Sequence, residues 1–374
     1  MIAIDTTCFS KEDILNKNIV SGIGTWLSEI FDFIIESNKA QQYTLLTKFY
    51  AKQFFAERFR GFRYESFGGA TSNIILKYTG KSTETYLKKR GINTKVLDSL
   101  QHVETVWFPF AIPEIVYPTK KKTVMTVHDF MRCNNEKNHK LYREMLSSAT
   151  QIIAISDYVK RDLLERFPEF RSRKIPVIPN SISVKFNDTE QCPEINSPFI
   201  LDINRFEKHK NPETLLRAFN IYVHEMRGIA DLVFVGFGDV GYLNELKEYA
   251  KKNGISNRVH FFWRLEAPKK NWLLQNASLF VSPSVNEGMG RTPVEAMQCG
   301  IPVLTTKETA LYEATLGLAK YCDDPYDEHE MAKRIDSMLK ERNQQMLNNV
   351  KLQVTDEYSV ENIWGKYTDI ICSL

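Results

Sequence analysis

The sequence predicts an α/β protein built from two doubly wound domains in tandem. Short apolar runs alternate with longer amphipathic stretches along the chain, which is the pattern of parallel strands joined by helices. A polar stretch at 186–198, which carries Pro193 and Pro198, interrupts the alternation, and the alternation then restarts. With 374 residues the chain is long enough for two ordinary domains.

In the first half, amphipathic stretches predict helices over Gly24–Ser37 and Tyr158–Arg166. Ser156 precedes the second helix and is expected to cap it, because a serine hydroxyl accepts hydrogen bonds from N–H groups at a helix start. Apolar runs predict strands over Ile2–Ile4, Tyr43–Leu46, Thr105–Phe108, Thr123–Val127, Gln151–Ile155 and Ile175–Ile178.

The second half repeats the pattern. Ligands of doubly wound domains bind at the carboxyl ends of the strands, so we expect a ligand there, in the cleft between the domains. A last helix, Val360–Ile371, has one apolar face and needs a surface to pack on. The predicted strands are Phe199–Ile203, Leu232–Val235, Val259–Trp263, Ala277–Val281 and Pro302–Thr305, with helices near 212–227, 241–253, 267–275, 292–299 and 326–341.

Composition and charge narrow the class of protein. The chain is 43% hydrophobic with a net charge of +3, which indicates a globular protein and argues against nucleic-acid binding. Its six cysteines form no CxxC pair, which indicates free thiols in a reducing compartment. The sequence shows no signal peptide and no apolar run near the ~20 residues that span a bilayer. We expect a cytoplasmic protein, with a peripheral position on the inner membrane face as an alternative.

The stretch 48–95 is rich in lysine, arginine and aromatic residues, among them Phe54, Phe55, Phe59 and Phe62. Two interpretations carry equal weight. The stretch is either ordinary solvated surface, or a patch that faces a membrane or an acidic acceptor.

The stretch Asn286–Met297 is the main candidate site. An apolar strand runs into a glycine-rich turn that opens a helix, and such a helix start can hold an anion. Glu287 and Glu295 flank the turn and can accept hydrogen bonds from hydroxyl groups, so phosphate plus hydroxyls suggests a nucleotide-sugar. The structural alternative for Glu295 is a capping box that begins at Thr292, and for Glu287 it is a solvated loop.

Two cations follow the first strand of the second domain. Arg205 comes at the strand end and Lys210 just before a helix, which suits a diphosphate: arginine binds it as a fork and lysine as a point charge. An ordinary basic loop is the alternative.

Three further features are weaker by themselves. Gly236 and Gly238 form a tight turn after a strand, and Gly22 and Gly24 lie at the start of the first helix, where an anion can bind. His128 ends an apolar strand and is expected to point into the cleft, although a lone histidine is more often structural.

Together these elements resemble the retaining glycosyltransferases of family four, which have two Rossmann-like domains in the GT-B arrangement. The resemblance covers most of the chain and consists of several motifs in the family's order. The motifs are the stretch from Glu287 to Glu295-Ala296, Arg205 with Lys210-Asn211, Gly236-x-Gly238, the loop Ser21–Gly24, His128-Asp129, and Tyr358-Ser359 with Trp364 of a closing helix.

The resemblance implies roles for single residues. Glu295 would bind the ribose hydroxyls and Glu287 the donor sugar. Arg205 and Lys210 would hold the diphosphate, and His128 would contact the sugar. No metal is expected. Further contacts to the nucleotide-sugar are implied for Gly22, Gly24, Gly236, Gly238, Arg264, Gly288, Met289, Gly290 and Arg291.

The resemblance also implies the domain roles. The N-terminal domain, 1–187, would face the acceptor and be completed by the helix 358–374, and the domain 188–357 would bind the donor. The chain departs from the family pattern at Ser21, Met289 and Arg291-Thr292, and at Trp263-Arg264, where a glycine usually follows the strand. These departures leave the donor open.

The leading hypothesis is a retaining transferase that moves a hexose from GDP-mannose or a UDP-hexose to a glycan or lipid-linked glycan. The transfer would rely on positioning and electrostatics rather than on a protein nucleophile. The alternatives are a sugar-nucleotide epimerase or a phosphorylase on the same architecture and, with less weight, a nucleotide-sugar binding protein without catalytic activity.

Overall fold

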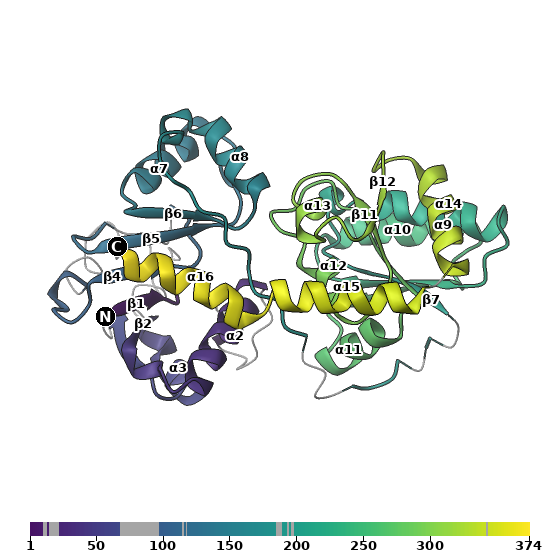
Figure 1. Ribbon diagram of the computed structural model, residues 1–374. Coiled ribbons are helices and arrows are strands. Elements are labelled where there is room, and N and C mark those ends of the chain that lie inside the picture. Colours follow the sequence, from purple (N-terminus) through teal and green to yellow (C-terminus); the bar gives the residue numbers. More distant parts are fainter. Residues whose placement is uncertain are drawn as a thin grey trace. The chain divides into compact units, whose positions relative to one another are not determined.

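The computed structural model contains two compact units, each built around its own parallel six-stranded sheet (Figure 1). One unit comprises Met1–Ser181 with Val360–Leu374, and the other comprises Ile182–Ser359. The structure describes residues 1–9, 13–14, 22–67, 97–113, 116, 118–184, 189–192, 194–195, 198–341 and 343–374.

The first sheet has the strand order β3-β2-β1-β4-β5-β6. Edge strand β3 was not predicted. The predicted strand Ile175–Ile178 is wrong, since only a single bridge joins Val177 to Ala154. Pro176 has no N–H group to donate to a ladder, and its carbonyl accepts instead from Ala154. The strands are β1 (Ile2–Asp5), β2 (Tyr43–Lys48), β3 (Arg63–Phe67), β4 (Thr105–Phe108), β5 (Lys122–Val127) and β6 (Gln151–Ala154).

The helices of this unit confirm the predicted cap, because the Ser156 hydroxyl accepts from the Val159 N–H at 3.1 Å. The first helix begins earlier than predicted, at Gly22. The helices are α2 (Gly22–Glu36), α3 (Lys52–Arg58), α7 (Glu136–Ser147), α8 (Asp157–Arg166) and α16 (Val360–Ser373), with short 3-10 turns η1 (Ala40–Gln42), η2 (Phe49–Ala51) and η3 (Pro168–Phe170).

The last helix, α16, returns to the first unit, as predicted. It packs beside α2 and buries its apolar face in the core of this unit (Figure 1). The rings of Trp364 and Tyr367 lie 5.5 and 4.8 Å from that of Trp107 on β4. The helix therefore completes the hydrophobic core of the N-terminal unit.

Four phenylalanines of the basic stretch are core residues. Phe54, Phe55, Phe59 and Phe62 are all buried with the residues of α2. These four rings are therefore unavailable to a membrane or an acceptor, and the interpretation as a surface patch is wrong for them. The rest of the stretch, from 68 to 95, lies outside the described residues.

The second sheet has the strand order β12-β11-β10-β7-β8-β9. The short edge strand β12 was not predicted, and the other bounds differ from the prediction by at most two residues. The strands are β7 (Phe199–Ile203), β8 (Asp231–Gly236), β9 (Val259–Trp263), β10 (Leu279–Ser282), β11 (Val303–Thr306) and β12 (Lys320–Cys322).

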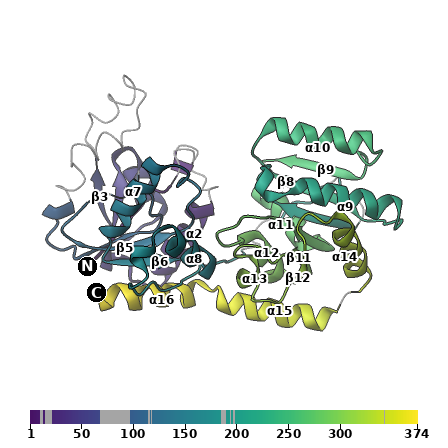
Figure 2. The same cartoon turned by 90° about the horizontal axis from the view of Figure 1, so that it is seen from above.

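The helices of the second unit cover its sheet (Figure 2). Helices α9, α10 and α14 bury their apolar sides in one hydrophobic core, which also contains side chains of β8 and of the central strands. Helices α11 and α15 pack on α12, and α15 was not predicted. The helices are α9 (Pro212–His224), α10 (Val240–Lys252), α11 (Ala267–Asn276), α12 (Arg291–Gln298), α13 (Leu311–Ala314), α14 (Glu328–Lys340) and α15 (Gln344–Glu357), with the 3-10 turn η4 (Lys208–Lys210).

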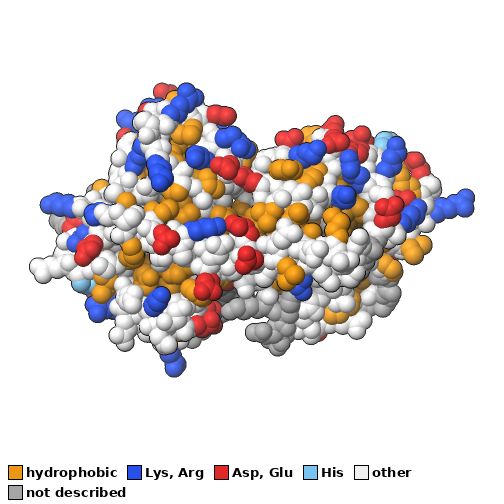
Figure 3. Space-filling view, viewed as in Figure 1, with side chains coloured by type: hydrophobic (Ala, Val, Ile, Leu, Met, Phe, Trp, Pro, Cys, Tyr) orange, Lys and Arg blue, Asp and Glu red, His pale blue; other side chains and the backbone are white. Residues whose placement is uncertain are grey.

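The surface carries charges of both signs. Acidic and basic side chains are interspersed on the face that Figure 3 shows, in keeping with the net charge of +3. None of the helices in the described part of the chain has the length and hydropathy of a membrane span.

Candidate active site

Most of the predicted site residues lie at one edge of the second sheet. Strands β10, β7, β8 and β9 are adjacent and parallel, so their carboxyl ends meet at that edge. Arg205 and Lys210 follow β7, Gly236 ends β8 with Gly238 just after it, and Arg264 follows β9. The turn from Glu287 to Gly290 follows β10 and leads into α12. The structure therefore brings the cations, the glycine turns and both glutamates onto one unit.

Lys210 and Glu287 form an ion pair. The Nζ atom of Lys210 lies 2.6 Å from Oε1 of Glu287, and both side chains are mostly buried. Beside the pair, the Val285 N–H donates to the His209 carbonyl at 2.9 Å, so the two loops are also joined through the backbone. The Glu287 N–H donates to the Thr309 hydroxyl at 3.1 Å, which fixes the backbone that carries the carboxylate. This acid and this base are thus held together before any ligand binds.

Arg291 and Glu295 form a second pair, with Arg291 Nε donating to Glu295 Oε1 at 2.9 Å across one turn of α12. The predicted capping box is wrong, because α12 begins at Arg291 and has no side-chain cap bond. Thr292 therefore lies inside the first turn. Gly290 sets this start, since its φ of 82° is left-handed and a Cβ there would lie 2.5 Å from Leu311. Arg291, which the family pattern did not explain, binds the carboxylate expected to hold the ribose.

The glycine turn after β8 makes room for the neighbouring loop. A Cβ on Gly236 would lie 1.8 Å from the Asn204 carbonyl oxygen, and one on Gly238 would lie 2.7 Å from that of Phe206. In return, the Phe206 N–H donates to the Phe237 carbonyl at 2.9 Å. The close backbone approach that the sequence indicates is therefore the contact between this turn and the Arg205 loop.

Arg205 and Arg264 both lie over the ring of Phe237. Their guanidinium carbons are 5.6 and 5.4 Å from the ring centre, within the range of a cation–π contact. Arg205 also pairs with Glu207, Nη2 to Oε1, at 2.6 Å. Phe237 was not among the predicted site residues, because a phenylalanine between two glycines gives no signal by itself.

Asp202, on β7, is a buried acid that the sequence analysis did not single out. It is 2% exposed, and its carboxylate accepts from the Asn204 amide at 2.6 Å. Burial raises the pKa of Asp202 to about 7; the hydrogen bond from Asn204 and the charge of Lys210 oppose this rise, and the charge of Glu287 adds to it. An aspartate within the apolar run Phe-Ile-Leu-Asp-Ile was the signal that could have revealed it.

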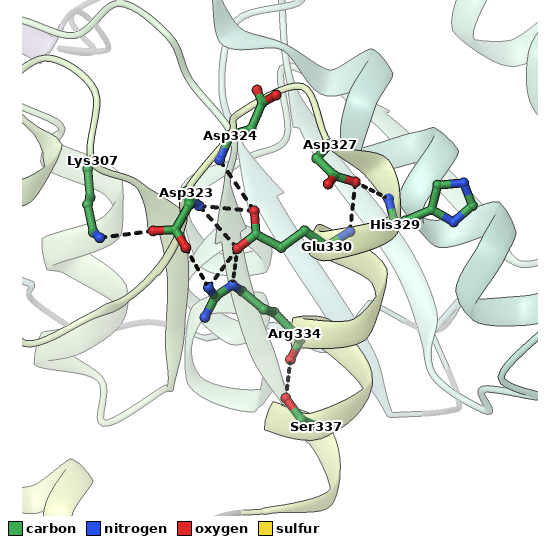
Figure 4. Close-up of polar contacts among 8 residues, drawn as sticks. All are labelled: Lys307, Asp323, Asp324, Asp327, His329, Glu330, Arg334 and Ser337. Atoms are coloured by element: carbon green, nitrogen blue, oxygen red, sulfur yellow. Dashed lines mark hydrogen bonds and ion pairs between the residues drawn. The ribbon is translucent and has the colours of Figure 1, made fainter.

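Charged side chains of α14 and of the loop between β12 and α14 form a polar network (Figure 4). The Glu330 carboxylate accepts from the backbone N–H groups of Asp323 and Asp324 and from Arg334, so it fixes the loop between β12 and α14. In that loop the Pro325 carbonyl accepts from the Asn211 amide at 2.7 Å. Asn211 follows Lys210 and is left-handed, with a φ of 54°. The network therefore holds the residue next to the Lys210–Glu287 pair.

The first unit holds the remaining predicted residues. His128 is 7% exposed and lies between the rings of Trp26 and Phe110. Its Nε2 lies 2.8 Å from the Pro109 carbonyl, which can only accept, so Nε2 carries the proton. Burial lowers the pKa of His128 to about 4, which leaves the ring neutral at pH 7 with Nδ1 as an acceptor.

Gly22 and Gly24 lie in the first turn of α2 rather than in a loop before it. The N–H groups of a first helical turn have no acceptor within the helix, and an anion at this turn stays a prediction. Ser21 lies outside the described residues.

Two family models match the chain. "Glycosyl transferases group 1" matches residues 187–352, and "Glycosyltransferase Family 4" matches residues 85–186. The chain is a group 1 glycosyltransferase of the GT-B fold that resembles family 4. The first of these matches spans the edge of the second sheet just described, and the second includes His128.

The curated relatives of this glycosyltransferase include mannosyltransferases. The chain is 32% identical over 142 residues to alpha-1,3/1,6-mannosyltransferase ALG2 of Dictyostelium discoideum, a match that spans 34% of each protein. It is 27% identical over 257 residues to alpha-1,3/1,6-mannosyltransferase alg-2 of Neurospora crassa, which spans 59% of this chain and 54% of that protein. The glycosyltransferase thus spans between about a third and half of the length of these relatives.

Solved structures share the whole fold. Anabaena Alr3699/HepE in complex with UDP-glucose superposes with a TM-score of 0.71 at 16% identity, over 100% of this chain and 99% of that chain. Sucrose-phosphate synthase of Thermosynechococcus elongatus gives a TM-score of 0.70 at 15% identity, with the same coverage. At such identities the likeness establishes the fold of the glycosyltransferase.

Proposed function

We propose that the glycosyltransferase transfers mannose from GDP-mannose to a glycan or lipid-linked glycan, with retention of the anomeric configuration. The observation that carries the proposal is the pair of acid–base contacts, Lys210–Glu287 and Arg291–Glu295, at the two ends of the glycine turn after β10. Together they offer cations for phosphate and carboxylates for hydroxyl groups at one sheet edge.

Lys210 and Arg205 would bind the diphosphate. An ammonium group has three N–H donors, so Lys210 can contact phosphate oxygen while it stays bonded to Glu287. The two cations would stabilise the negative charge that grows on the diphosphate as it leaves, and this stabilisation is strongest in a site that excludes water.

The two glutamates would bind hydroxyl groups. Glu287, held by Lys210 and by the bond from its own N–H to Thr309, would accept from the sugar. Glu295 has lone pairs beyond the one that Arg291 uses and would accept from the ribose. Fixing both ends of the donor lowers the entropy that the transfer step must lose.

In the proposed step, the bond from the anomeric carbon to the diphosphate oxygen breaks, and a bond to the acceptor hydroxyl oxygen forms on the same face. The acceptor proton passes to an oxygen of the departing diphosphate, which balances the charges without a protein nucleophile. His128 is neutral, so its proposed contact with the sugar would be a hydrogen bond accepted by Nδ1 rather than an ion pair.

Mannose is favoured as the donor sugar because several of the curated relatives are mannosyltransferases by name. A UDP-hexose is the second candidate, since a structure with the same fold was solved with UDP-glucose. We further propose that the protein acts in the cytoplasm, with the basic residues of 48–95 near an inner membrane surface if the acceptor is lipid-linked, and that no metal is needed.

The test is a donor screen with product analysis. The protein is incubated with GDP-mannose, UDP-glucose and UDP-galactose, with glycan and lipid-linked glycan acceptors, and with or without EDTA. We expect GDP release and a mannosylated acceptor, and we expect the amounts to be equal with and without EDTA. An isomerised free nucleotide-sugar would identify an epimerase, dependence on phosphate a phosphorylase, and binding without turnover a binding protein; each result would contradict the proposal.

A further inference from the structure

Thr309 is a β-branched residue with left-handed backbone, in the turn between β11 and α13. Its φ is 58°. Such residues are rare in this conformation, because Cβ comes close to the following carbonyl oxygen and the branch adds to the crowding. A glycine would adopt the same backbone with less strain. Among the described residues other than glycine that have a positive φ, Thr309 is the one with a β-branched side chain; the others are Asn38, Asn211, Arg227, Arg264 and Leu316.

The threonine hydroxyl makes a contact that a glycine could not make. Thr309 Oγ1 accepts from the Glu287 N–H at 3.1 Å. The next residue holds the other backbone group, since the Ala310 N–H donates to the Glu287 carbonyl at 3.3 Å. The turn after β11 therefore holds Glu287 on both sides of its Cα, and of these two bonds the one from Thr309 depends on a side chain.

The backbone bond from Thr309 bears on the position of the Glu287 carboxylate. That side chain is 16% exposed, and its Oε1 lies 2.6 Å from Lys210 Nζ, so a small shift of the backbone would lengthen the contact. Strained backbone persists where the surrounding structure enforces it, and it is concentrated at functional sites. In this protein the strained residue is the one whose side chain fixes the backbone of the acid in the candidate site.

We propose that Thr309 is a positioning residue for sugar transfer: its hydroxyl holds the Glu287 backbone so that the carboxylate faces both Lys210 and the donor sugar. The inference rests on the proposed role of Glu287 in binding that sugar. In this role Thr309 acts through Glu287 and does not contact the donor itself. Stability and activity then make opposite demands on position 309, because the backbone favours glycine and the transfer needs the hydroxyl.

The experiment compares three variants at this position. Thr309→Ser keeps the hydroxyl, Thr309→Val keeps the β-branched shape without the hydroxyl, and Thr309→Gly removes both the hydroxyl and the strain. Turnover is measured with GDP-mannose, or with the UDP-hexose that is turned over in its place. A displacement of about 1 Å can slow a reaction by about 100-fold, so kcat should fall by about tenfold or more in Thr309→Val and Thr309→Gly and stay within about threefold in Thr309→Ser.

The temperature of thermal unfolding should follow the backbone instead of the hydroxyl. Thr309→Gly should unfold at a higher temperature than Thr309→Val, because both lack the hydroxyl and Thr309→Gly alone relieves the left-handed strain. Arg227→Gly is the matched control. Arg227 is also left-handed, with a φ of 57°, in the loop that precedes β8 at the opposite edge of the sheet, and its substitution should leave kcat unchanged.

Amide hydrogen exchange of the segment 285–290 gives a second measurement, which does not depend on turnover. Exchange should be faster in Thr309→Val and Thr309→Gly than in the wild type, because the Glu287 N–H loses its acceptor, and unchanged in Thr309→Ser.

A kcat of Thr309→Val within about threefold of the wild type would overturn the inference. Activities that follow the unfolding temperatures would also overturn it, as would unchanged exchange of the segment 285–290 in Thr309→Val. In each of these cases the proposed function stands, since the wild type still transfers sugar. If the wild type turns over no nucleotide-sugar, the proposed function fails and this inference fails with it.

Discussion

Asp202 offers the sharpest prediction about stability, because it is a buried acid beside the candidate site. Its pKa is raised from 3.8 to about 7, chiefly by burial. The folded protein therefore keeps this proton up to about pH 7, whereas the unfolded chain releases it near pH 4. Between these values the folded state binds more protons, so stability falls as the pH rises from about 4 to 7.

The magnitude follows from the shift. One pKa unit corresponds to about 1.4 kcal/mol, so the rise amounts to roughly 4 kcal/mol of lost stability above pH 7. Asp202→Asn removes the charge and keeps an oxygen that accepts from the Asn204 amide. The new amide N–H groups lie in the buried site and cost about 1–3 kcal/mol if they find no acceptor. We therefore expect a net gain of about 1–3 kcal/mol at pH 8, and a net loss of about 1–3 kcal/mol below pH 4, where only the cost of the amide remains.

The assay is the midpoint of thermal unfolding of both proteins at pH 4 and at pH 8, with Asp336→Asn as the control. Asp336 is on α14 and pairs with Lys340 at the surface, so its substitution should shift the midpoint by the same small amount at both values. Asp202→Asn should raise the midpoint by several degrees at pH 8 alone. An equal difference between variant and wild type at both pH values would refute the reasoning.

The remaining predictions concern the core and the first unit. Gly236→Ala should destabilise by more than about 2 kcal/mol in urea unfolding, because its Cβ would meet the Asn204 carbonyl, whereas Gly365→Ala on α16 meets nothing within 4 Å and should stabilise by about 0.5–1 kcal/mol. Trp364→Ala should cost about 3–5 kcal/mol by the same assay, since it removes a buried ring; a loss under 1 kcal/mol would contradict the role of α16 in the core. Burial lowers the pKa of His128 from 6.5 to about 4, so as the pH falls the unfolded chain binds a proton before the folded protein does. Stability should therefore fall as the pH drops from about 6.5 to 4. His128→Gln should flatten that part of the pH profile, and an unchanged profile would assign it to other groups.

The sequence predicts the central strands of both sheets and the edge strands β6 and β9, but it misses the other edge strand of each sheet. Central parallel strands are buried on both faces, so they appear as continuous apolar runs such as Leu232–Val235. The edge strand β3 has the sequence Arg-Tyr-Glu-Ser-Phe, and β12 has only Lys-Tyr-Cys, so neither gives an apolar run. The error at Ile175–Ile178 is the opposite one. The apolar run there suggested a strand, but Pro176 has no N–H group to donate to a neighbouring strand.

The candidate site was predictable as a set of residues but not as a set of contacts. The position of Lys210 and Glu287 at strand ends follows from the sequence, yet their 2.6 Å ion pair depends on how two loops from non-consecutive strands meet. The Arg291–Glu295 pair has ordinary helical spacing. It was missed because Thr292-Pro293 resembles a helix start, while the observed N-cap is the left-handed Gly290, two residues before Thr292.

The central claim is that Lys210 and its neighbours hold the diphosphate of a nucleotide-sugar donor. The most direct test is GDP release from GDP-mannose, with an acceptor identified in the donor screen, by the wild type and by Lys210→Met, which keeps the length of the side chain and removes its charge. We predict a loss of kcat/KM of about 100-fold or more in a variant that unfolds at the wild-type temperature or close to it. Turnover within about twofold of the wild type would contradict the account.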